Sequence, residues 1–561
     1  MIKKLSEESR YFLNNKMYVI SLIIAAVAGY GYQLTHGTCG IDDIAIDMYF
    51  EDGLGVAIGR WPFFYVNKLI NVAEYQPFLM DFAAVLLLML AAVLWSALIR
   101  SIVKIELPIM CYAVFSTMFM VYSLIAEVFI FYLHNGIAII YCLVAVCLYG
   151  FYYLYVNRLD AKKKIGMNAI FAIQMCVAIS FYESAANLYL FGALGVIFLD
   201  TVNENRLGTS QVKNAVRLMW YIVRILIYAI VGRSVVTTYT MQAFSIKEYF
   251  FRSVTSIGWL SSGDLKELYV NVIMLIKEIV KDYFAAGAVF YPILLFGLAT
   301  ILFLVFVFYK AICQKNIWIG IYGVATYLSL YVLTVIQCDT LKYRSCQMFS
   351  VFVAGVLMAL TNVILKQRRW IKAIGMFSVL AIIYNSAKDL THWFVLDYEK
   401  NQTELRVVNQ IAYDIQSGGY DFASKPIVFV GDFSLKEELL DEYCVKKGEN
   451  GFEIVDWAHT WMELTEDKYC FTQSLQSSLI DWAIEGLYAY GGYNKPLQNL
   501  FEYCGYSFIW GDSVLYEEVM PLYYYYEMEH EYAKIEAYGE LEQFPYEGYI
   551  EETEDYIVIK L

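Results

Sequence analysis

About eleven apolar stretches, each close to the length of a membrane-spanning helix, limit what this sequence can fold into. A helix that crosses a bilayer needs roughly 20 mostly apolar residues. Of the chain's 561 residues, 59% are hydrophobic and only 17% charged, whereas ordinary soluble domains have about a quarter charged residues. We therefore exclude a purely soluble protein and expect a polytopic α-helical membrane protein, with spans near 17–33, 78–99, 107–133, 137–156, 166–181, 185–200, 216–236, 285–309, 317–336, 346–365 and 372–386.

Charge divides the chain into two parts. Residues 387–561 have 11 Lys and Arg against 34 Asp and Glu, a net charge of −23, and the rest of the chain carries +9. We expect a transmembrane module at 1–386, with long outer loops at 34–77 and 237–284, and a small acidic α/β domain at 387–561. The total of −14 argues against a nucleic-acid partner.

Orientation follows from the short loops, because Lys and Arg concentrate on the cytoplasmic side. Basic residues precede the first span and follow each even-numbered span. This pattern predicts a cytoplasmic N-terminus and a C-terminal domain outside the cell. The two long outer loops contain amphipathic stretches, at 48–72 and 246–260, which either lie in the membrane interface or pack as ordinary outer helices.

The acidic domain shows both helical and strand-like patterns. Helical spacing at 403–418 ends at Gly418 and Gly419, a usual helix stop. A second helix is expected at 478–492, and strands at 425–432 and 555–561. Exposed aromatic rings stack on sugars, so the tyrosine run at 523–526 suggests acceptor binding. The alternative, which we favour, is a structural cap over the outer loops.

Carboxylates gather directly after the first span, in GTCGIDDIAID (37–47). Asp42 and Asp43 are adjacent, so their repulsion favours a raised pKa in one of them, which suits a general base. Asp47 lies one helical turn beyond Asp43 and is a further candidate. The alternatives are a solvated acidic loop or a helix N-cap.

Two aromatic motifs contain the next candidates. In GRWPFF (59–64), Arg60 stands beside Trp61; Arg suits bidentate binding of phosphate, although an interfacial anchor is an equal alternative. The segment FYES interrupts an apolar stretch and places Tyr182 and Glu183 at the outer end of two short spans.

Ionisable side chains within spans are costly and are functional candidates by default. Glu127 and Arg233 belong to this group, and His134 caps the helix that contains Glu127. The alternative is a buried ion pair, for instance between Glu127 and Arg233.

The loop QCDTLKYRSCQ (337–347) gives an outer loop an unusual basic rim, with Lys342, Tyr343 and Arg344. Phosphate binding explains these residues, and compensation of Asp339 is the alternative.

Several kinds of site lack support in the sequence. It has no CxxC, HExxH, phosphate-binding P-loop or dinucleotide fingerprint, and its five histidines are scattered. No cofactor is expected, whereas a divalent metal stays open because free carboxylates could bind one. Its eleven cysteines fix no disulfide, although Cys338 and Cys346 flank one outer loop.

The IDD pair at 41–43, the GRW at 59–61 and the aromatic-Tyr-acid break near 180–187 resemble the GtrII-type bacterial glucosyltransferases of the GT-C superfamily. The layout of the whole chain is similar to theirs. One departure is Glu183, where the family pattern often has Gln.

The resemblance implies an inverting glycosyltransferase of the bacterial inner membrane. Its donor is expected to be a sugar, glucose by preference, on undecaprenyl phosphate. Its acceptor is expected to be an extracytoplasmic surface glycan, such as O-antigen or a teichoic-acid-like polymer. The base role transfers to Asp42 or Asp43, and Arg344, Lys342 and Arg60 become candidates for binding the donor phosphate, which leaves with negative charge. A carrier-sugar synthase and a flippase are implied as partner activities.

Two other functions stay open. A transporter or flippase of lipid-linked sugars is expected to show internal repeats and midplane polar residues; Arg217, Arg224 and Arg233 in the seventh span favour it most. A glycan polymerase or ligase would rely on Arg-rich outer loops instead of the IDD pair.

Overall fold

A computed structural model provides the structure of this protein. It describes residues 1–40, 42–46, 49, 53–71, 76–103, 106–131, 135–157, 160–246, 291–337, 345–430, 479–480, 483, 495–511 and 541–561. The chain forms two compact units. The first contains the described residues of Met1–Gly37 and Tyr49–Phe394. The second contains those of Thr38–Met48, Val395–Lys446 and Cys470–Leu561.

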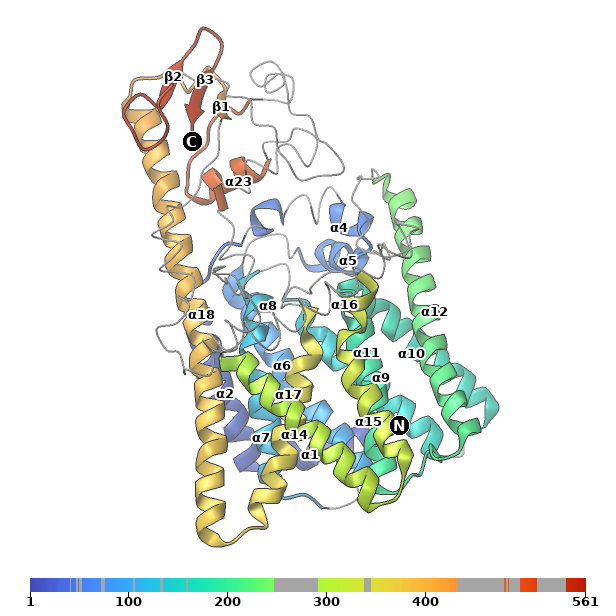
Figure 1. The fold of residues 1–561 in the computed structure, drawn as a ribbon. Helices are drawn as coiled ribbons and strands as arrows, with labels where there is room; N and C mark the ends of the chain where they lie inside the picture. The colour runs from blue at the N-terminus through green and yellow to red at the C-terminus, as the bar shows by residue number, and fades with distance from the viewer. Residues whose placement is uncertain are drawn as a thin grey trace, which may run out of the picture. The chain divides into compact units, whose positions relative to one another are not determined.

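The first unit is a helical bundle (Figure 1). Its elements are α1 (Ile2–Leu13), α2 (Lys16–Thr35), α4 (Leu54–Ala57), α5 (Trp61–Ile70), α6 (Pro77–Ile102), α7 (Ile109–Val121), η2 (Ser123–Ile125), α8 (Ala126–Ile130), α9 (Ile137–Val156), α10 (Ala161–Phe181), α11 (Ala185–Asn203), α12 (Val212–Phe244), α14 (Tyr291–Cys313), α15 (Ile317–Leu328), η7 (Ser329–Tyr331), α16 (Val332–Gln337), α17 (Gln347–Leu365) and the first part of α18 (Arg369–Ser417).

The expected fold class, a polytopic helical membrane protein, is confirmed. Nine helices in the described part of the chain are long and apolar enough to cross a membrane. The third expected span is bent by 43° between Ile109–Val121 and Ser123–Ile130, because Tyr122 has extended backbone angles that interrupt the helix. The ninth covers its expected positions as α15, η7 and α16 in succession, and its apolar part, Ile317–Tyr331, is shorter than the nine long helices. The other nine expected positions coincide with the long helices.

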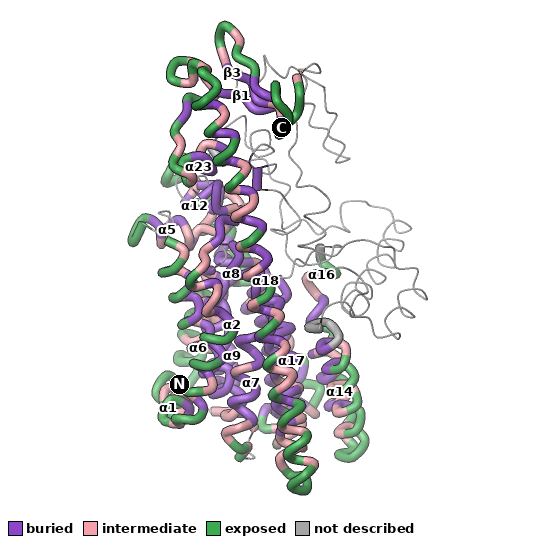
Figure 2. The backbone as a smooth tube through the Cα atoms, turned by 90° about the vertical axis from the view of Figure 1, so that its left-hand side faces the viewer, coloured by how far each residue is buried: buried purple, intermediate pink, exposed green. Residues whose placement is uncertain are grey.

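Helix α9 lies at the centre of the bundle core. In its most apolar stretch 78% of the residues are buried inside the protein, against 28% for α14, so α9 is central and α14 peripheral (Figure 2). Gly150 of α9 lets the helices approach closely, because a Cβ there would lie 1.9 Å from the Phe171 ring of α10.

The break that the sequence indicates at FYES is confirmed. Helix α10 ends at Phe181, Tyr182 is extended with φ −161° and ψ 137°, and α11 begins at Ala185. The three intervening residues belong to neither helix. The side chains of Tyr182 and Glu183 can therefore contact other elements.

The second unit contains a three-stranded sheet of β1 (Ile427–Val430), β2 (Ile550–Glu552) and β3 (Ile557–Lys560) in the order β1-β3-β2. Strand β1 runs parallel to β3 and β2 runs antiparallel to it. Both strands expected from the sequence are thus confirmed, whereas most of the helix expected at 478–492 and the tyrosines at 523–526 lie outside the described residues. The unit also contains η1 (Asp43–Ala45) and α23 (Lys495–Tyr503).

Helix α18 is continuous over 49 residues. It joins the last expected span, 372–386, to the helix expected at 403–418, because no Gly or Pro interrupts the sequence between Met376 and Ser417. It ends where the sequence indicates, before Gly419, whose φ of 78° suits a helix C-terminus. The expected domain boundary at residue 387 falls inside this helix.

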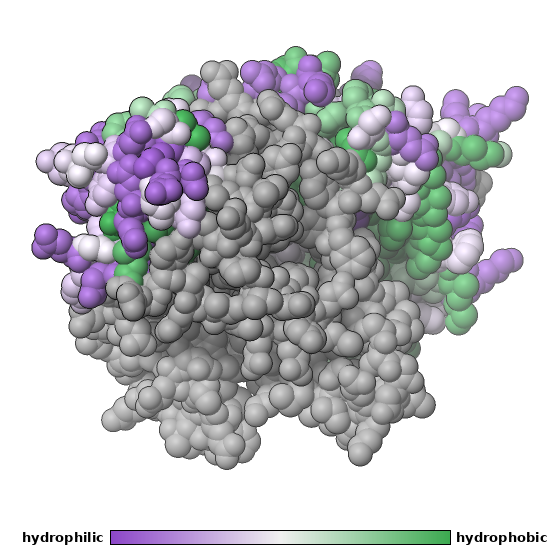
Figure 3. Space-filling model, turned by 90° about the horizontal axis from the view of Figure 1, so that it is seen from above, coloured by the Kyte–Doolittle hydropathy of each residue, from purple (hydrophilic) through white to green (hydrophobic). Residues whose placement is uncertain are grey.

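The described surfaces differ in character when viewed from above (Figure 3). Both hydrophilic and hydrophobic residues lie on the described part of this face. Val231, Val235 and Tyr239 of α12 are 55%, 62% and 67% exposed. Exposed apolar side chains at this density fit a lipid-facing helix surface.

Candidate functional site

The two adjacent carboxylates of the loop after α2 have different environments. Asp43 is buried, and its Oδ2 accepts a hydrogen bond of 2.8 Å from the backbone N–H of Gly40. The Asp43 N–H donates in return to the Gly40 carbonyl at 3.0 Å, which closes a tight turn. Asp42, directly before η1, is partly exposed. Of the two, Asp42 is therefore the carboxylate that a solute can reach.

Side chains from distant parts of the second unit fix this loop. The Asn401 amide of α18 donates to the Cys39 carbonyl at 3.0 Å, and the Asn499 amide of α23 donates to the Ile44 carbonyl at 2.7 Å. Burial raises the pKa of the Cys39 thiol well above its usual range, and the nearby Asp43 carboxylate raises it further. The loop thus has a neutral thiol beside a buried carboxylate.

Charged side chains are buried next to this loop on α18. Lys400 and Glu404 are each 2% exposed, and the Lys400 Nζ lies 3.9 Å from the Glu404 Oε1. The same Glu404 oxygen accepts a 2.6 Å hydrogen bond from the Leu479 N–H. Buried charges persist only where partners compensate them. This part of α18 therefore requires the partners that Lys400 and Glu404 have in the fold.

A second group of candidates meets in the first unit. The Glu183 carboxylate lies between two arginines: its Oε1 accepts a 2.5 Å hydrogen bond from Arg233, and its Oε2 lies 3.7 Å from the Arg60 Nη2. These three side chains are between 10% and 13% exposed. One carboxylate thus joins two arginines in an Arg60–Glu183–Arg233 cluster.

Backbone carbonyls complete the environment of Arg233. Its Nη2 donates to the Ile58 carbonyl at 2.8 Å and its Nε to the Gly59 carbonyl at 3.2 Å. Gly59 has a φ of 87°, and a Cβ there would lie 2.5 Å from the Arg233 Nη2. Both the backbone conformation and the space therefore require glycine directly before Arg60.

Aromatic rings flank Arg60. Its guanidinium lies over the Tyr182 ring at 4.7 Å from the centroid, a cation–π distance. The Tyr182 hydroxyl accepts a long, 3.4 Å hydrogen bond from the Ser345 hydroxyl. Trp61 is the first residue of α5, and Pro62 follows it. The Trp61 ring contacts the Tyr65 ring edge-on, with 6.0 Å between the two centroids. The structure therefore brings together four sequence candidates, Arg60, Tyr182, Glu183 and Arg233.

The expected alternative for Glu127, an ion pair with Arg233, is wrong. Arg233 pairs with Glu183 instead, while Glu127 is buried in the first turn of α8. Pairing with Glu183 becomes possible because the FYES break frees that side chain from the helices. Five other candidates lie outside the described residues: Asp47, His134, Lys342, Tyr343 and Arg344.

The sequence reasoning missed one buried polar network. Asp81, 2% exposed in α6, accepts hydrogen bonds from Gln33 at 3.2 Å and from Asn135 at 2.5 Å. A lone carboxylate in an apolar stretch was the available signal. Within the described ranges, no three His, Cys, Asp or Glu side chains form a group able to hold a metal ion.

Comparison with known proteins gives a family match. The family model described as "Glucosyl transferase GtrII" matches residues 31–361, more than half of the chain. Those residues include Asp42 and Asp43, the GRW motif, the FYES break and Arg233. No curated protein and no solved structure matches. The chain therefore belongs to the GtrII family of glucosyl transferases.

Proposed function

We propose that this membrane glucosyltransferase moves a sugar, glucose by preference, from undecaprenyl phosphate to a cell-surface glycan outside the cytoplasm. The family match over 31–361 supports transfer of glucose. A lipid-linked donor is supported by a chain with nine described helices of membrane-spanning length and no nucleotide-binding motif in its sequence.

In the proposed reaction Asp42 is the general base. The acceptor hydroxyl oxygen attacks the anomeric carbon while its proton passes to the Asp42 carboxylate. The bond from the anomeric carbon to the phosphate oxygen breaks, and polyprenyl phosphate leaves with the electron pair. Direct displacement inverts the anomeric centre. The observation that carries this assignment is the contrast between a partly exposed Asp42 and an Asp43 that is buried and bonded to Gly40.

The proposed role of the Arg60–Glu183–Arg233 cluster is to bind the donor phosphate. Two guanidinium groups at low exposure favour an anion, because a charge interaction is stronger away from bulk water. Guanidinium groups match phosphate oxygens in pairs. In this proposal Glu183 positions both arginines and Tyr182 supports the Arg60 guanidinium.

The proposed location is the bacterial inner membrane, with the N-terminus in the cytoplasm and the C-terminal unit outside. The basic loops after even-numbered spans support this orientation. The sugar carrier would come from a carrier-sugar synthase and a flippase. O-antigen and teichoic-acid-like polymers are the acceptor classes proposed.

The test compares Asp42→Asn with Asp43→Asn in transfer from synthetic polyprenyl-phosphate-glucose. We expect Asp42→Asn to lower kcat by about 10²–10⁴-fold with normal membrane levels. Asp43→Asn should lower the unfolding temperature and leave more activity per folded molecule. Full transfer by Asp42→Asn would exclude it as the base. Movement of lipid-linked sugar across the bilayer with no new glycosidic bond would identify a transporter instead.

A further inference from the structure

A pocket of about 300 Å³ opens between α9, α10 and α12, within the first unit. It lies near the C-terminal end of α9 and the N-terminal ends of α10 and α12, where Tyr155, Lys164 and Arg217 line it. The basic loops of the sequence connect the helices at this end. It is separate in sequence and in lining residues from the Arg60–Glu183–Arg233 cluster.

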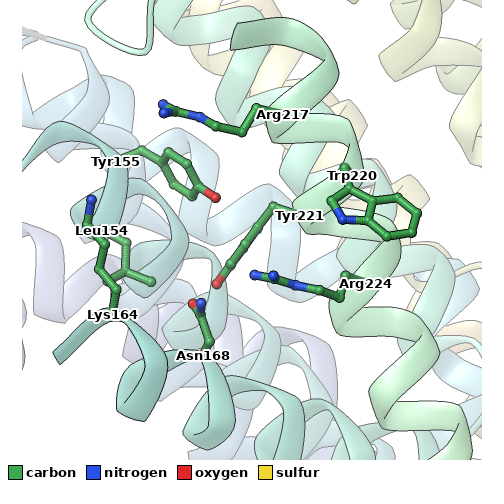
Figure 4. A pocket seen from close by; sticks show the side chains of 8 residues that line it. All are labelled: Leu154, Tyr155, Lys164, Asn168, Arg217, Trp220, Tyr221 and Arg224. Atoms are coloured by element: carbon green, nitrogen blue, oxygen red, sulfur yellow. The ribbon is translucent and has the colours of Figure 1, made fainter. Parts of the chain in front are cut away.

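The lining is cationic and aromatic. Lys164, Arg217 and Arg224 contribute positive charge, and none of the described residues that line the pocket is acidic. The Arg217 guanidinium lies 5.4 Å from the Tyr155 ring centroid and that of Arg224 lies 5.6 Å from the Tyr221 ring centroid. Figure 4 shows both guanidinium groups extending from α12 to the same side, toward the two tyrosine rings, while the Trp220 ring points the opposite way.

Several buried polar atoms in this pocket have no hydrogen-bond partner among the described residues. They are the Tyr221 hydroxyl, the Arg224 Nε and the Asn168 Oδ1. Tyr221 is only 2% exposed. An unpaired buried donor is costly, and at membrane depth water cannot satisfy it. The two donors therefore indicate a ligand that supplies acceptor oxygens and negative charge.

The helix surface next to the pocket is apolar and exposed. On α10, Ile170 and Ile173 are 60% and 65% exposed, within about a turn of Asn168. On α12, Val223 and Ile227 are each 44% exposed, beside and one turn beyond Arg224. A ligand with a charged head and long hydrocarbon chains would match both parts of this surface.

We propose that the pocket binds the phosphate headgroup of an anionic phospholipid. Basic pockets between transmembrane helices bind lipid phosphates by charge, and the two guanidinium groups supply matched donors for phosphate oxygens. This site holds lipid as a structural ligand at the end of the bundle where the basic loops lie. The inference does not rest on the sugar-transfer proposal.

The test uses the full chain in nanodiscs of phosphatidylcholine with one fifth phosphatidylglycerol. Lipid retained by the protein after detergent extraction is measured by native mass spectrometry, and thermal unfolding is measured beside it. The double variant Arg217→Gln/Arg224→Gln should retain phosphatidylglycerol on the order of tenfold less than the unaltered protein. The matched control is Lys213→Gln, which removes one charge from α12 at an exposed position that does not line the pocket.

The outcomes separate the explanations. Selective loss in the double variant, with Lys213→Gln unchanged, supports the site. Equal loss in Lys213→Gln would mean general surface attraction and would overturn it, as would undiminished retention in the double variant. Displacement of all retained lipid by millimolar inorganic phosphate would assign the pocket to free phosphate. If the double variant unfolds, Tyr221→Phe tests the same site, because it removes only the unpaired hydroxyl and should also lower retention.

Discussion

Two parts of α12 hold arginine in different ways. In the second half of the helix, Arg233 donates to the Glu183 carboxylate and to the carbonyls of Ile58 and Gly59. In the first half, Arg217 and Arg224 lie over tyrosine rings in a pocket whose described lining includes no acidic residue. Protein partners hold Arg233 in place before any ligand binds, whereas Arg217 and Arg224 have no carboxylate beside them among the described pocket residues. This difference separates an arginine whose removal should cost stability from two whose removal should affect mainly the binding of an anion.

The strongest test of this contrast removes Arg233. Arg233→Met leaves a buried carboxylate without its closest partner, and we expect the unfolding free energy to fall by about 3–5 kcal/mol. Arg224→Met is the matched control on the same helix, and we expect a change within about 1 kcal/mol. Thermal unfolding in neutral detergent measures both. A loss at Arg224 as large as that at Arg233 would contradict the distinction.

A smaller effect is expected from Gly59→Ala, which tests how tightly Arg233 is held. The positive φ alone costs about 1–2 kcal/mol for a residue with a Cβ. The new methyl group would also displace the Arg233 guanidinium from its carbonyls. As a control, Gly166→Ala in α10 has open space around its Cβ and should raise helix stability by about 0.5–1 kcal/mol. The prediction is wrong if Gly59→Ala unfolds at the same temperature as the unaltered protein.

Glu183→Gln should leave Arg233 without a carboxylate partner, as Arg217 and Arg224 are within the described lining of their pocket. The side chain keeps its shape but loses its charge, so we expect about 1–2 kcal/mol of lost stability. If the cluster binds the donor phosphate, the KM for the lipid-linked donor should fall because the Glu183 carboxylate no longer competes with the phosphate for the two guanidinium groups. Steady-state kinetics with the synthetic donor measure the change. An unchanged KM together with lower stability would confine Glu183 to a structural role.

The smallest effect is expected from Tyr221→Phe in a neutral lipid. Its hydroxyl has no partner in the described structure, so removal should change stability by less than about 1 kcal/mol and in the stabilising direction. Tyr18→Phe is the contrast, because that hydroxyl lies 2.6 Å from the Ser116 hydroxyl and its loss should cost about 1 kcal/mol. Thermal unfolding compares the two. A larger loss at Tyr221 would show that its hydroxyl is already satisfied.

The spans were predictable from the sequence because hydropathy measures what a bilayer requires. The FYES break between α10 and α11 was equally visible, since Tyr182 and Glu183 interrupt an apolar run. The bend at Tyr122 was not, because the residues on both sides are equally apolar and only the backbone angles change. The continuity of α18 was missed because the sequence reasoning placed a boundary where the charge changes, and a change of charge need not end a helix.

At the candidate site, the sequence indicated which side chains matter but not how they pair. Arg60, Glu183 and Arg233 come from three distant segments, and no spacing rule links them. The difference between Asp42 and Asp43 was also hidden, because it depends on one backbone hydrogen bond to Gly40 and on burial of a single carboxylate. Tertiary structure, rather than residue type, separates these two neighbours.

The attachment of the loop that contains Asp42 has a consequence for the order in which the protein matures. Residues 38–46 are synthesised early, yet their partners Asn401 and Asn499 follow 362 and 455 residues after Cys39 and Ile44. At about 5–20 residues per second, a ribosome needs on the order of half a minute or more to supply the second amide. During that time the helices can enter the membrane while the aspartate loop still lacks both anchors. The segment that contains Asp42 is therefore among the first to be translated and among the last to acquire its final contacts.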